Sequence, residues 1–429
     1  MNTENVRQAL RTEKAGSFLR GLYGDGAGGS LARYDGVIDG FERNFGGGEI
    51  SLFSSPGRTE ISGNHTDHNH GRVLAGSINL DCVAAARKNE DGKVRIISET
   101  FHQDFSFAAD DLEPSSRKAG TVDLTKGLVR GCKERGYAVG GFDAYITSNV
   151  ISAAGVSSSA AYEMLICAVL NEFYNGGAMD AAACARIGQY AENVYWGKAS
   201  GLMDQMACAV GGLVAMDFKD PQEPVVEKLA FDFGAQNHSL MIVSTGKGHA
   251  DLSADYSSIP QEMRRVAEFF GKDVCREITE EQVIGHLAQV RASAGDRAVM
   301  RALHFFEEDK RVEAMAAALK EGDFDAFLRG ITASGNSSWK WLQNCYTTSD
   351  VREQGISVAL ALTELFIQKK GRGVCRVHGG GFAGVIMAIL PDDLAEEYAG
   401  YMDGALGAGS VCRMSIRLHG AVCLDRFLF

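Results

Sequence analysis

The sequence predicts a two-domain α+β protein, and three observations lead to that fold class. The chain has 429 residues, more than one hydrophobic core usually supports, so two domains are expected. Strand-like and helix-like segments alternate irregularly through the first half, which favours a mixed α/β sandwich over a doubly wound parallel sheet. A polar stretch at residues 220–224 holds two of the six prolines. We therefore expect one domain over residues 1–220 and a second over residues 221–429.

Local patterns predict the elements of the first half. Apolar residues recur at helical spacing from Val6 to Leu22 and again over about residues 124–135. Runs rich in apolar and β-branched residues predict strands at residues 50–54, 82–86, 94–97 and 142–146.

The second half is expected to open with a strand, at residues 239–243, and then to be mostly helical from Gln261 to Lys370. The same patterns predict the remaining elements at residues 374–377 (strand), 385–390 (strand), 392–402 (helix) and 415–418 (strand).

Composition excludes several classes of partner. The net charge of -12 and the lack of any basic run argue against binding to nucleic acid or to acidic membranes. The N-terminus has no apolar core of a signal peptide, and no apolar run approaches a membrane span. Ten scattered cysteines without C-x-x-C pairs indicate free thiols. We expect a cytoplasmic protein that is a monomer or a weak homo-oligomer.

A glycine-rich and serine-rich stretch, residues 155–161, predicts the start of a helix beside a bound anion. Gly155 permits a sharp turn, and apolar residues recur at helical spacing from Ala161 to Phe173, so we expect a helix that begins at the three serines. The free amides and the dipole of a first helical turn favour phosphate, and serine hydroxyls can reach a bound Mg²⁺. The pattern equally suits an ordinary core helix capped by serine.

Two further glycine-rich stretches have a chemistry of their own. Residues 57–67 crowd polar groups beside a tight backbone, which suits a hydroxylated small molecule. Residues 379–384 lie between two predicted strands. They fit a hairpin loop, which we favour, or a close approach of the backbone to a ligand.

Four motifs together resemble the galactokinases of the GHMP kinase superfamily. They are a G-R-x-x-x-x-G-x-H-T-D-x-N segment, the serine loop, a G-L-M-D-Q segment and the late glycine cluster, at residues 57–69, 155–161, 201–205 and 379–384. Their order and spacing match across roughly residues 45 to 390. The first of the four is the most specific.

The resemblance implies a two-domain fold and a reaction. The N-terminal domain would be a mixed α/β domain of the ribosomal protein S5 domain 2-like type, and the C-terminal domain would be ferredoxin-like. The active site would lie in the cleft between them. The activity implied is ATP-dependent transfer of a phosphoryl group to the anomeric hydroxyl of galactose, with ATP and Mg²⁺ required.

Two residues match the catalytic positions of the family. Asp204 matches the aspartate beside the sugar C1 hydroxyl, and its place in the first turn of an expected helix, Met203 to Val210, favours the charged carboxylate. Without the resemblance, an aspartate there would more often be a helix cap. Arg58 matches the arginine that helps to neutralise the transferring phosphoryl group. An arbitrary arginine would more often form a surface or interdomain ion pair.

The remaining roles are carried over by the same motifs. The sugar would be bound by Asn64, His65, Thr66, Asp67 and Tyr256. The nucleotide phosphates would be bound by Ala153, Ala154, Gly155, Val156, Ser157, Ser158, Ser159, Gly380 and Gly381. Mg²⁺ would be held by Ser159 and Glu192, since hard oxygen ligands suit this ion.

One departure from the family concerns the sugar. Galactokinases typically carry glutamate immediately before His-Thr-Asp, where it accepts a hydrogen bond from the C6 hydroxyl, and this chain has Asn64. A carboxylate there would repel a C6 carboxylate by about 1 to 4 kcal/mol, so asparagine opens the alternative of galacturonate or another C6-modified galactose. Arg72 offers a positive charge nearby. Galactose remains the preferred substrate because asparagine is compatible with both sugars.

Departures also occur outside residues 57–69, which we call the sugar segment. Ile151 and Ala153 replace a common proline and glycine of the nucleotide loop, and Gly335 stands where histidine is usual. A third hypothesis is a sugar sensor without catalysis. Sensors of this type are expected to lose part of the serine loop, whereas Ser157 to Ala161 is intact here and Asp204 is present.

Overall fold

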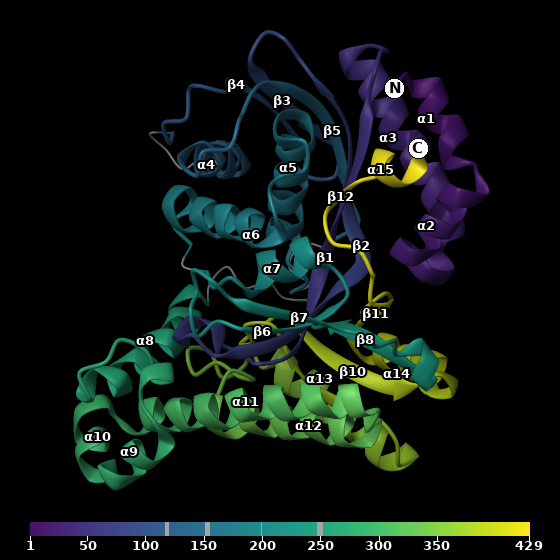
Figure 1. Ribbon diagram of the computed structural model, residues 1–429. Helices are drawn as coiled ribbons and strands as arrows, with labels where there is room; N and C mark the ends of the chain where they lie inside the picture. The colour runs from purple at the N-terminus through teal and green to yellow at the C-terminus, as the bar shows by residue number, and fades with distance from the viewer. Residues whose placement is uncertain (116–119, 151–154, 199, 247–251) are drawn as a thin grey trace.

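Two β-sheets organise the chain, one in each half of the ribbon in Figure 1. The computed structural model describes residues 1–115, 120–150, 155–198, 200–246 and 252–429. Among these residues the larger sheet has eight strands and the smaller has four. Helices cover both faces of the larger sheet and lie beneath the smaller one (Figure 1).

The larger sheet has the order β12-β1-β2-β5-β3-β4, and β6 extends it from β2 to β7. All of its pairs are antiparallel except β3 with β5. Its strands are β1 (Ser51–Ser62), β2 (Arg72–Lys88), β3 (Lys93–Ser98), β4 (Gln103–Ala108), β5 (Phe142–Ser148), β6 (Leu213–Asp217), β7 (Val225–Leu229) and β12 (Val422–Cys423).

Alternation along β1 and β2 buries both faces of this sheet. Phe53 and Ala84 belong to the core on one face, whereas Leu52 and Val83 belong to the core on the other. The first face is covered by α4 (Thr121–Glu134), α5 (Ser158–Asn175), α6 (Ala181–Tyr190) and α7 (Met203–Val210). The second is covered by α1 (Thr3–Leu10), α2 (Glu13–Tyr23), α3 (Ala27–Phe45) and α15 (Asp425–Leu428) (Figure 1).

The smaller sheet has the ferredoxin-like topology. Its strands are β8 (His238–Ser244), β9 (Val374–His378), β10 (Val385–Pro391) and β11 (Val411–Met414), all paired antiparallel in the order β11-β8-β10-β9. The helix α13 (Gly355–Lys370) precedes β9, and α14 (Asp392–Leu406) connects β10 to β11. The helices between β8 and α13 are α8 (Ser253–Phe269), α9 (Glu280–Gly285), α10 (Leu287–Ala294), α11 (Asp296–Glu321) and α12 (Phe324–Ser337).

Most of the predicted elements are present, but the predicted final strand at residues 415–418 is wrong. The strand of the smaller sheet ends at Met414. Ile416 forms only an isolated bridge with Ile78 of β2, and Arg417 already hydrogen-bonds to Ser54 of β1. The chain leaves the smaller sheet after Met414, because the hydrogen bonds of the next residues are made with strands of the larger sheet.

The division into domains at residue 220 stays a prediction. Residue 220 lies in the turn between β6 and β7, and both strands belong to the larger sheet. Val312 of α11 and Phe327 of α12 share a hydrophobic core with strands of that sheet. None of the described helices is long and apolar enough to cross a membrane.

A buried ion-pair network attaches the C-terminal segment to the larger sheet. Asp81 of β2 is fully buried and accepts hydrogen bonds from Arg417 at 3.0 Å, from Tyr23 at 2.7 Å, and from Arg33 and Ser54. Burial raises the pKa of Asp81, but the two arginines outweigh this effect and the pKa is lowered. The carboxylate therefore stays charged in the core.

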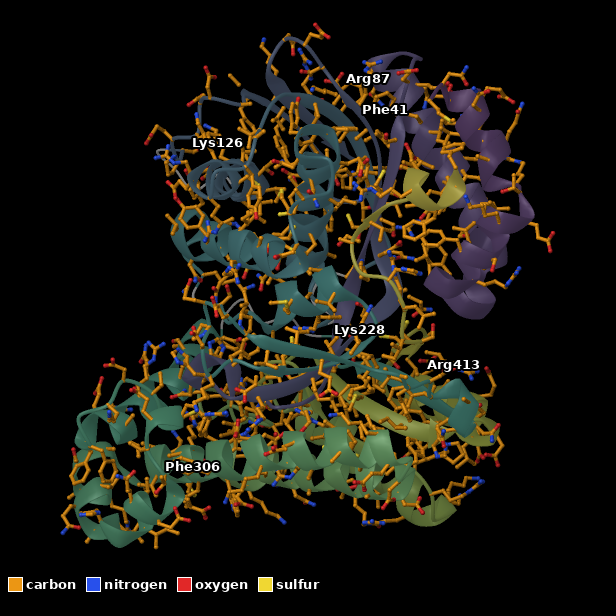
Figure 2. The ribbon with its side chains drawn as sticks, viewed as in Figure 1. Phe41, Arg87, Lys126, Lys228, Phe306 and Arg413 are labelled. Atoms are coloured by element: carbon orange, nitrogen blue, oxygen red, sulfur yellow. The ribbon has the colours of Figure 1, made fainter. Side chains whose placement is uncertain are left out.

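Removing one arginine of this network should destabilise the protein. Arg417→Ala should lower the free energy of unfolding by about 3 kcal/mol, because the buried Asp81 would lose a charged partner. Chemical denaturation measures the change. The control is Arg413→Ala, which removes an exposed ion pair with Asp392 at the surface (Figure 2) and should cost less than about 1 kcal/mol. Equal losses in the two variants would contradict the role of Arg417.

Candidate active site

A cavity of about 1080 Å³ brings together motifs that are far apart in the sequence. It is lined by the serine loop, by Gly379 to Phe382 and by side chains that include Arg58, Asp204 and Tyr256. A smaller cavity of about 50 Å³ shares Arg58, Asp204 and Tyr256 with it and is also lined by the sugar segment. The two cavities form one cleft, because they share lining residues.

The first two glycine-rich stretches touch each other at the cleft. The backbone N–H of Arg58 in β1 donates to the carbonyl of Val156 at 3.1 Å. A Cβ atom on Gly57 would lie 2.6 Å from that carbonyl oxygen, so only glycine permits this approach. The serine loop is therefore fixed directly against the strand that carries Arg58.

Arg58 and Asp204 form a bidentate ion pair at this junction. Arg58 Nε donates to Asp204 Oδ1 at 2.6 Å, and Nη2 donates to Oδ2 at 2.9 Å. Ser157 Oγ also donates to Asp204 Oδ2, and Arg58 Nη1 donates to the carbonyl of Gly155. Burial opposes ionisation, but the charge and hydrogen bonds of Arg58 and the hydrogen bond from Ser157 lower the pKa of Asp204 to about 2. Asp204 is therefore a carboxylate at neutral pH.

Helix α5 begins at Ser158, so the predicted helix start at the serines is confirmed. Ser157 adopts the left-handed conformation, with φ of 58°, and its side chain makes no capping hydrogen bond. Its hydroxyl is directed to Asp204 instead. Such strain in a non-glycine residue is typical of functional sites. The interpretation as an ordinary serine cap is therefore wrong for Ser157.

Glu192 provides a buried carboxylate beside the first turn of α5. It lies in a π-helical turn, Ala191–Trp196, a feature often found at functional sites. Ser159 Oγ donates to Glu192 Oε1 at 2.9 Å, and Lys198 Nζ donates to the same oxygen at 2.7 Å. Hydroxyl and carboxylate oxygens are ligands that Mg²⁺ prefers, so the donor atoms of Ser159 and Glu192 suit this ion. Lys198 is bonded to Oε1 and would have to give up this contact for a magnesium ion to bind there.

The sugar segment includes the end of β1 and continues into a tight turn. Thr66 is fully buried and its hydroxyl donates to the carbonyls of Gly63 and Arg72, so its side chain shapes the turn. Asp67 lines both cavities. His65 donates from Nε2 to the carbonyl of Gly380 at 2.9 Å. Burial and the neighbouring His68 lower the pKa of His65 to about 3, which keeps its imidazole neutral.

Tyr256 of α8 lines the cleft beside His65. Its ring lies 5.0 Å from the His65 ring and lines both cavities. Burial raises the pKa of Tyr256, so the phenol keeps its proton. The loop at residues 379–384 connects the antiparallel strands β9 and β10, so the predicted hairpin is confirmed. Its residues Gly380 and Gly381 also line the larger cavity.

Asn64 is held entirely by protein groups. Its amide nitrogen donates to Glu60 Oε1 at 2.7 Å and to the carbonyl of Gly379 at 2.7 Å, and its oxygen accepts from Asn344 at 2.6 Å. The sequence did not identify Glu60, which also lines the smaller cavity and pairs with Arg376 at 2.8 Å. Burial raises the pKa of Glu60, and the charges of Arg376 and Arg58 oppose the rise. The alternation of β1 was the available signal, since Glu60 lies two residues after Arg58.

The structure gives no support to a substrate with a carboxylate at C6. That alternative depended on a pocket without negative charge around Asn64, whereas Glu60 places a carboxylate in the same cavity. Arg72 does not help, because it pairs with Asp309 at 2.5 Å and with Asp217 at 3.2 Å. Ala153 and Ala154, predicted to bind phosphate, lie outside the described residues, as does Ile151.

Comparisons with known proteins identify the family. The galactokinase galactose-binding signature matches residues 39–88, and the N-terminal domain of GHMP kinases matches residues 123–212. A galactokinase of Streptomyces coelicolor is 30% identical over 356 residues, which are 82% of this chain and 87% of that protein. The chain belongs to the galactokinase family of GHMP kinases. A galactokinase of Ligilactobacillus salivarius is also 30% identical, over 84% of this chain and 91% of the relative.

Solved structures of GHMP kinases share the fold of this galactokinase family member. The crystal structure of Lactococcus lactis galactokinase complexed with galactose superposes with a TM-score of 0.78 and 24% identity, covering 91% of this chain and 99% of that one. A mevalonate kinase superposes with a TM-score of 0.59 and 15% identity, covering 85% and 98%. The predicted two-domain α+β fold class is confirmed. Membership in the family also makes the chain an ATP- and Mg²⁺-dependent sugar kinase.

The ion pair predicts how the reaction responds to pH. With the pKa of Asp204 lowered to about 2, Asp204 stays ionised over the whole working range and should cause no acidic fall in kcat/KM between pH 5 and 9. Arg58→Ala removes the largest of the contacts that lower this pKa and leaves only Ser157 and Lys198 to oppose the effect of burial, so the pKa rises and activity should fall as the pH is lowered towards 5. Parallel pH profiles for wild type, Arg58→Ala and the charge-conserving control Arg58→Lys measure this effect. An acidic limb equally present in wild type would contradict it.

Proposed function

We propose that the protein transfers the γ-phosphoryl group of ATP to the anomeric hydroxyl of galactose, forming galactose 1-phosphate and ADP. The observation that carries the proposal is the carboxylate of Asp204, kept ionised by Arg58 where the serine loop meets the sugar segment. The curated relatives are named galactokinases, and the Lactococcus lactis protein was crystallised with galactose. These names support galactose as the sugar.

The proposed chemistry places the sugar in the part of the cleft where the two cavities meet, with its anomeric hydroxyl at Asp204. An ionised carboxylate can accept the proton of that hydroxyl as its oxygen attacks the γ-phosphorus. Arg58 fixes the orientation of Asp204 through two hydrogen bonds and adds positive charge at the transferring group. His65, Asp67 and Tyr256 are proposed to contact the sugar, whereas Asn64 and Thr66 shape its pocket.

The proposed nucleotide site is the larger cavity. The amides at the start of α5 and the residues Gly155 to Ser159 would bind the phosphates, since the N-terminus of a helix attracts anions. Gly380 and Gly381 would close over them. Ser159 and Glu192 would hold Mg²⁺, which supplies positive charge to the phosphates. We further propose that the protein acts in the cytoplasm, which agrees with ten free cysteines. We also propose that it is a monomer or a weak homo-oligomer.

A pair of variants tests whether Asp204 accepts a proton in the reaction or only stabilises the start of a helix. Asp204→Asn should still bind galactose but lose turnover by roughly 10²- to 10⁴-fold, because the amide cannot accept the proton. Isothermal calorimetry measures binding, and ADP release measures turnover. The matched control is Asp180→Asn, at the N-cap of α6, where the side chain accepts from the backbone of Ala183. This variant should lose a little stability and keep its turnover. Near-normal turnover in Asp204→Asn would remove the assigned role.

The substrate is tested by a panel of sugars with ATP and Mg²⁺. Galactose should be phosphorylated at C1, which ³¹P NMR of the product identifies. Galacturonate should be a poor substrate because Glu60 faces the same cavity. A preference for galacturonate over galactose would overturn the proposed substrate.

A further inference from the structure

Glu60 is a carboxylate in the smaller cavity that the proposed mechanism leaves unused. It lies on β1 two residues after Arg58, so the two side chains lie on the same face of the strand. Both line the smaller cavity. Two residues of a strand span roughly 6.5 to 7 Å along the backbone, so Glu60 lies farther along the cleft than Arg58, the partner of Asp204. A hexose with its C1 hydroxyl at Asp204 would therefore present a hydroxyl remote from C1 to Glu60.

The two oxygens of Glu60 have different surroundings. Oε1 accepts from Asn64 Nδ2 at 2.7 Å and from Arg376 Nη2 at 2.8 Å. Among the described residues, no hydrogen bond involves Oε2. The carboxylate therefore has one oxygen fixed by the protein and one available as an acceptor.

Arg376 fixes this carboxylate from the smaller sheet. Its side chain is fully buried on β9, and Nη1 donates to the carbonyl of Ile61 at 2.6 Å. A Cβ atom on Gly335 would lie 2.9 Å from Arg376 Cβ, so glycine at this position lets α12 pack directly on the arginine. The unusual Gly335 and the position of Glu60 thus belong to one arrangement.

Asn64 completes the arrangement from the position where the family commonly has glutamate. Its amide donates to Glu60, and its oxygen is occupied by Asn344 at 2.6 Å. A second carboxylate at residue 64 would lie against Glu60 and repel it. Asparagine at residue 64 and glutamate at residue 60 are therefore complementary.

We propose that Glu60, held by Arg376 and Asn64, supplies the carboxylate that accepts the C6 hydroxyl of the sugar in this protein. The accepting carboxylate is thus at residue 60 in this chain, whereas the family commonly has it at residue 64. Glu60 then determines specificity for a hydroxymethyl group at C6, and Arg376 and Asn64 are positioning residues. This inference rests on the proposed function.

The test compares galactose, 6-deoxygalactose and galacturonate in wild type and variants. Wild type should favour galactose over 6-deoxygalactose in kcat/KM by roughly 10- to 150-fold, as expected for one hydrogen bond to a charged group. Glu60→Gln should reduce that preference to less than about 5-fold. It should also raise the ratio of galacturonate to galactose by about tenfold or more, because Arg376 loses its carboxylate partner. A variant that had merely lost structure would not gain activity on galacturonate.

Two further variants control for structure. In the exchange Glu60→Asn with Asn64→Glu, the carboxylate returns to residue 64, and the preference for galactose over 6-deoxygalactose should be restored. Glu308→Gln removes another buried carboxylate that bonds to Ser62 and the amide of Gly63 but does not line either cavity. It should lower the rates on galactose and 6-deoxygalactose alike.

The outcomes separate the inference from the function it rests on. If wild type phosphorylates galactose and Glu60→Gln keeps the full preference for galactose over 6-deoxygalactose, Glu60 does not accept the C6 hydroxyl. The inference then fails, whereas the proposed function stands. If Glu60→Gln does not fold, the exchange variant decides, since loss of its preference would equally overturn the inference. If wild type phosphorylates no galactose, the proposed function fails and the inference with it.

Discussion

The ion pair between Arg58 and Asp204 is the interaction on which the site depends. It joins β1, α7 and the serine loop at one point, because Arg58 also bonds to Gly155 and Ser157 also bonds to Asp204. A buried carboxylate without this partner would tend to take up a proton. The same contact therefore fixes the geometry of the cleft and keeps the carboxylate of Asp204 charged.

Buried polar contacts connect the sugar segment to elements of the second half in the same way. Glu60 pairs with Arg376 of β9, and Glu308 of α11 accepts from Ser62 and from the amide of Gly63. Each charge is costly to bury alone and is paired or hydrogen-bonded where it lies. The sugar segment is consequently held by two parts of the molecule. Strand pairing fixes it in the larger sheet, and buried polar contacts fix it to the smaller sheet and to α11.

The sequence predicted the fold class and most elements, because these follow from periodicity and from contiguous motifs. The resemblance singled out Arg58 and Asp204, and the structure brings them together as an ion pair. The starts of α5 and α7 at Ser158 and Met203 are local features, and local patterns predicted both. Contacts between distant segments could not be predicted in the same way. Glu60 was missed because its partner Arg376 is 316 residues away. Arg72 was expected to add positive charge near the sugar, but it pairs with Asp309 and Asp217 instead. The strand expected at residues 415–418 failed for the same reason, since its hydrogen bonds go to the larger sheet.

The charge state of Asp204 is tested most directly by carboxyl ¹³C NMR of the labelled protein, with the resonance assigned by its absence in Asp204→Asn. The ion pair predicts a chemical shift of an ionised carboxylate that does not change between pH 4 and 9, in agreement with a pKa of about 2. It also predicts that the resonance titrates at higher pH in Arg58→Ala. A wild-type resonance that titrates within that range would show that Arg58 does not hold the carboxylate ionised.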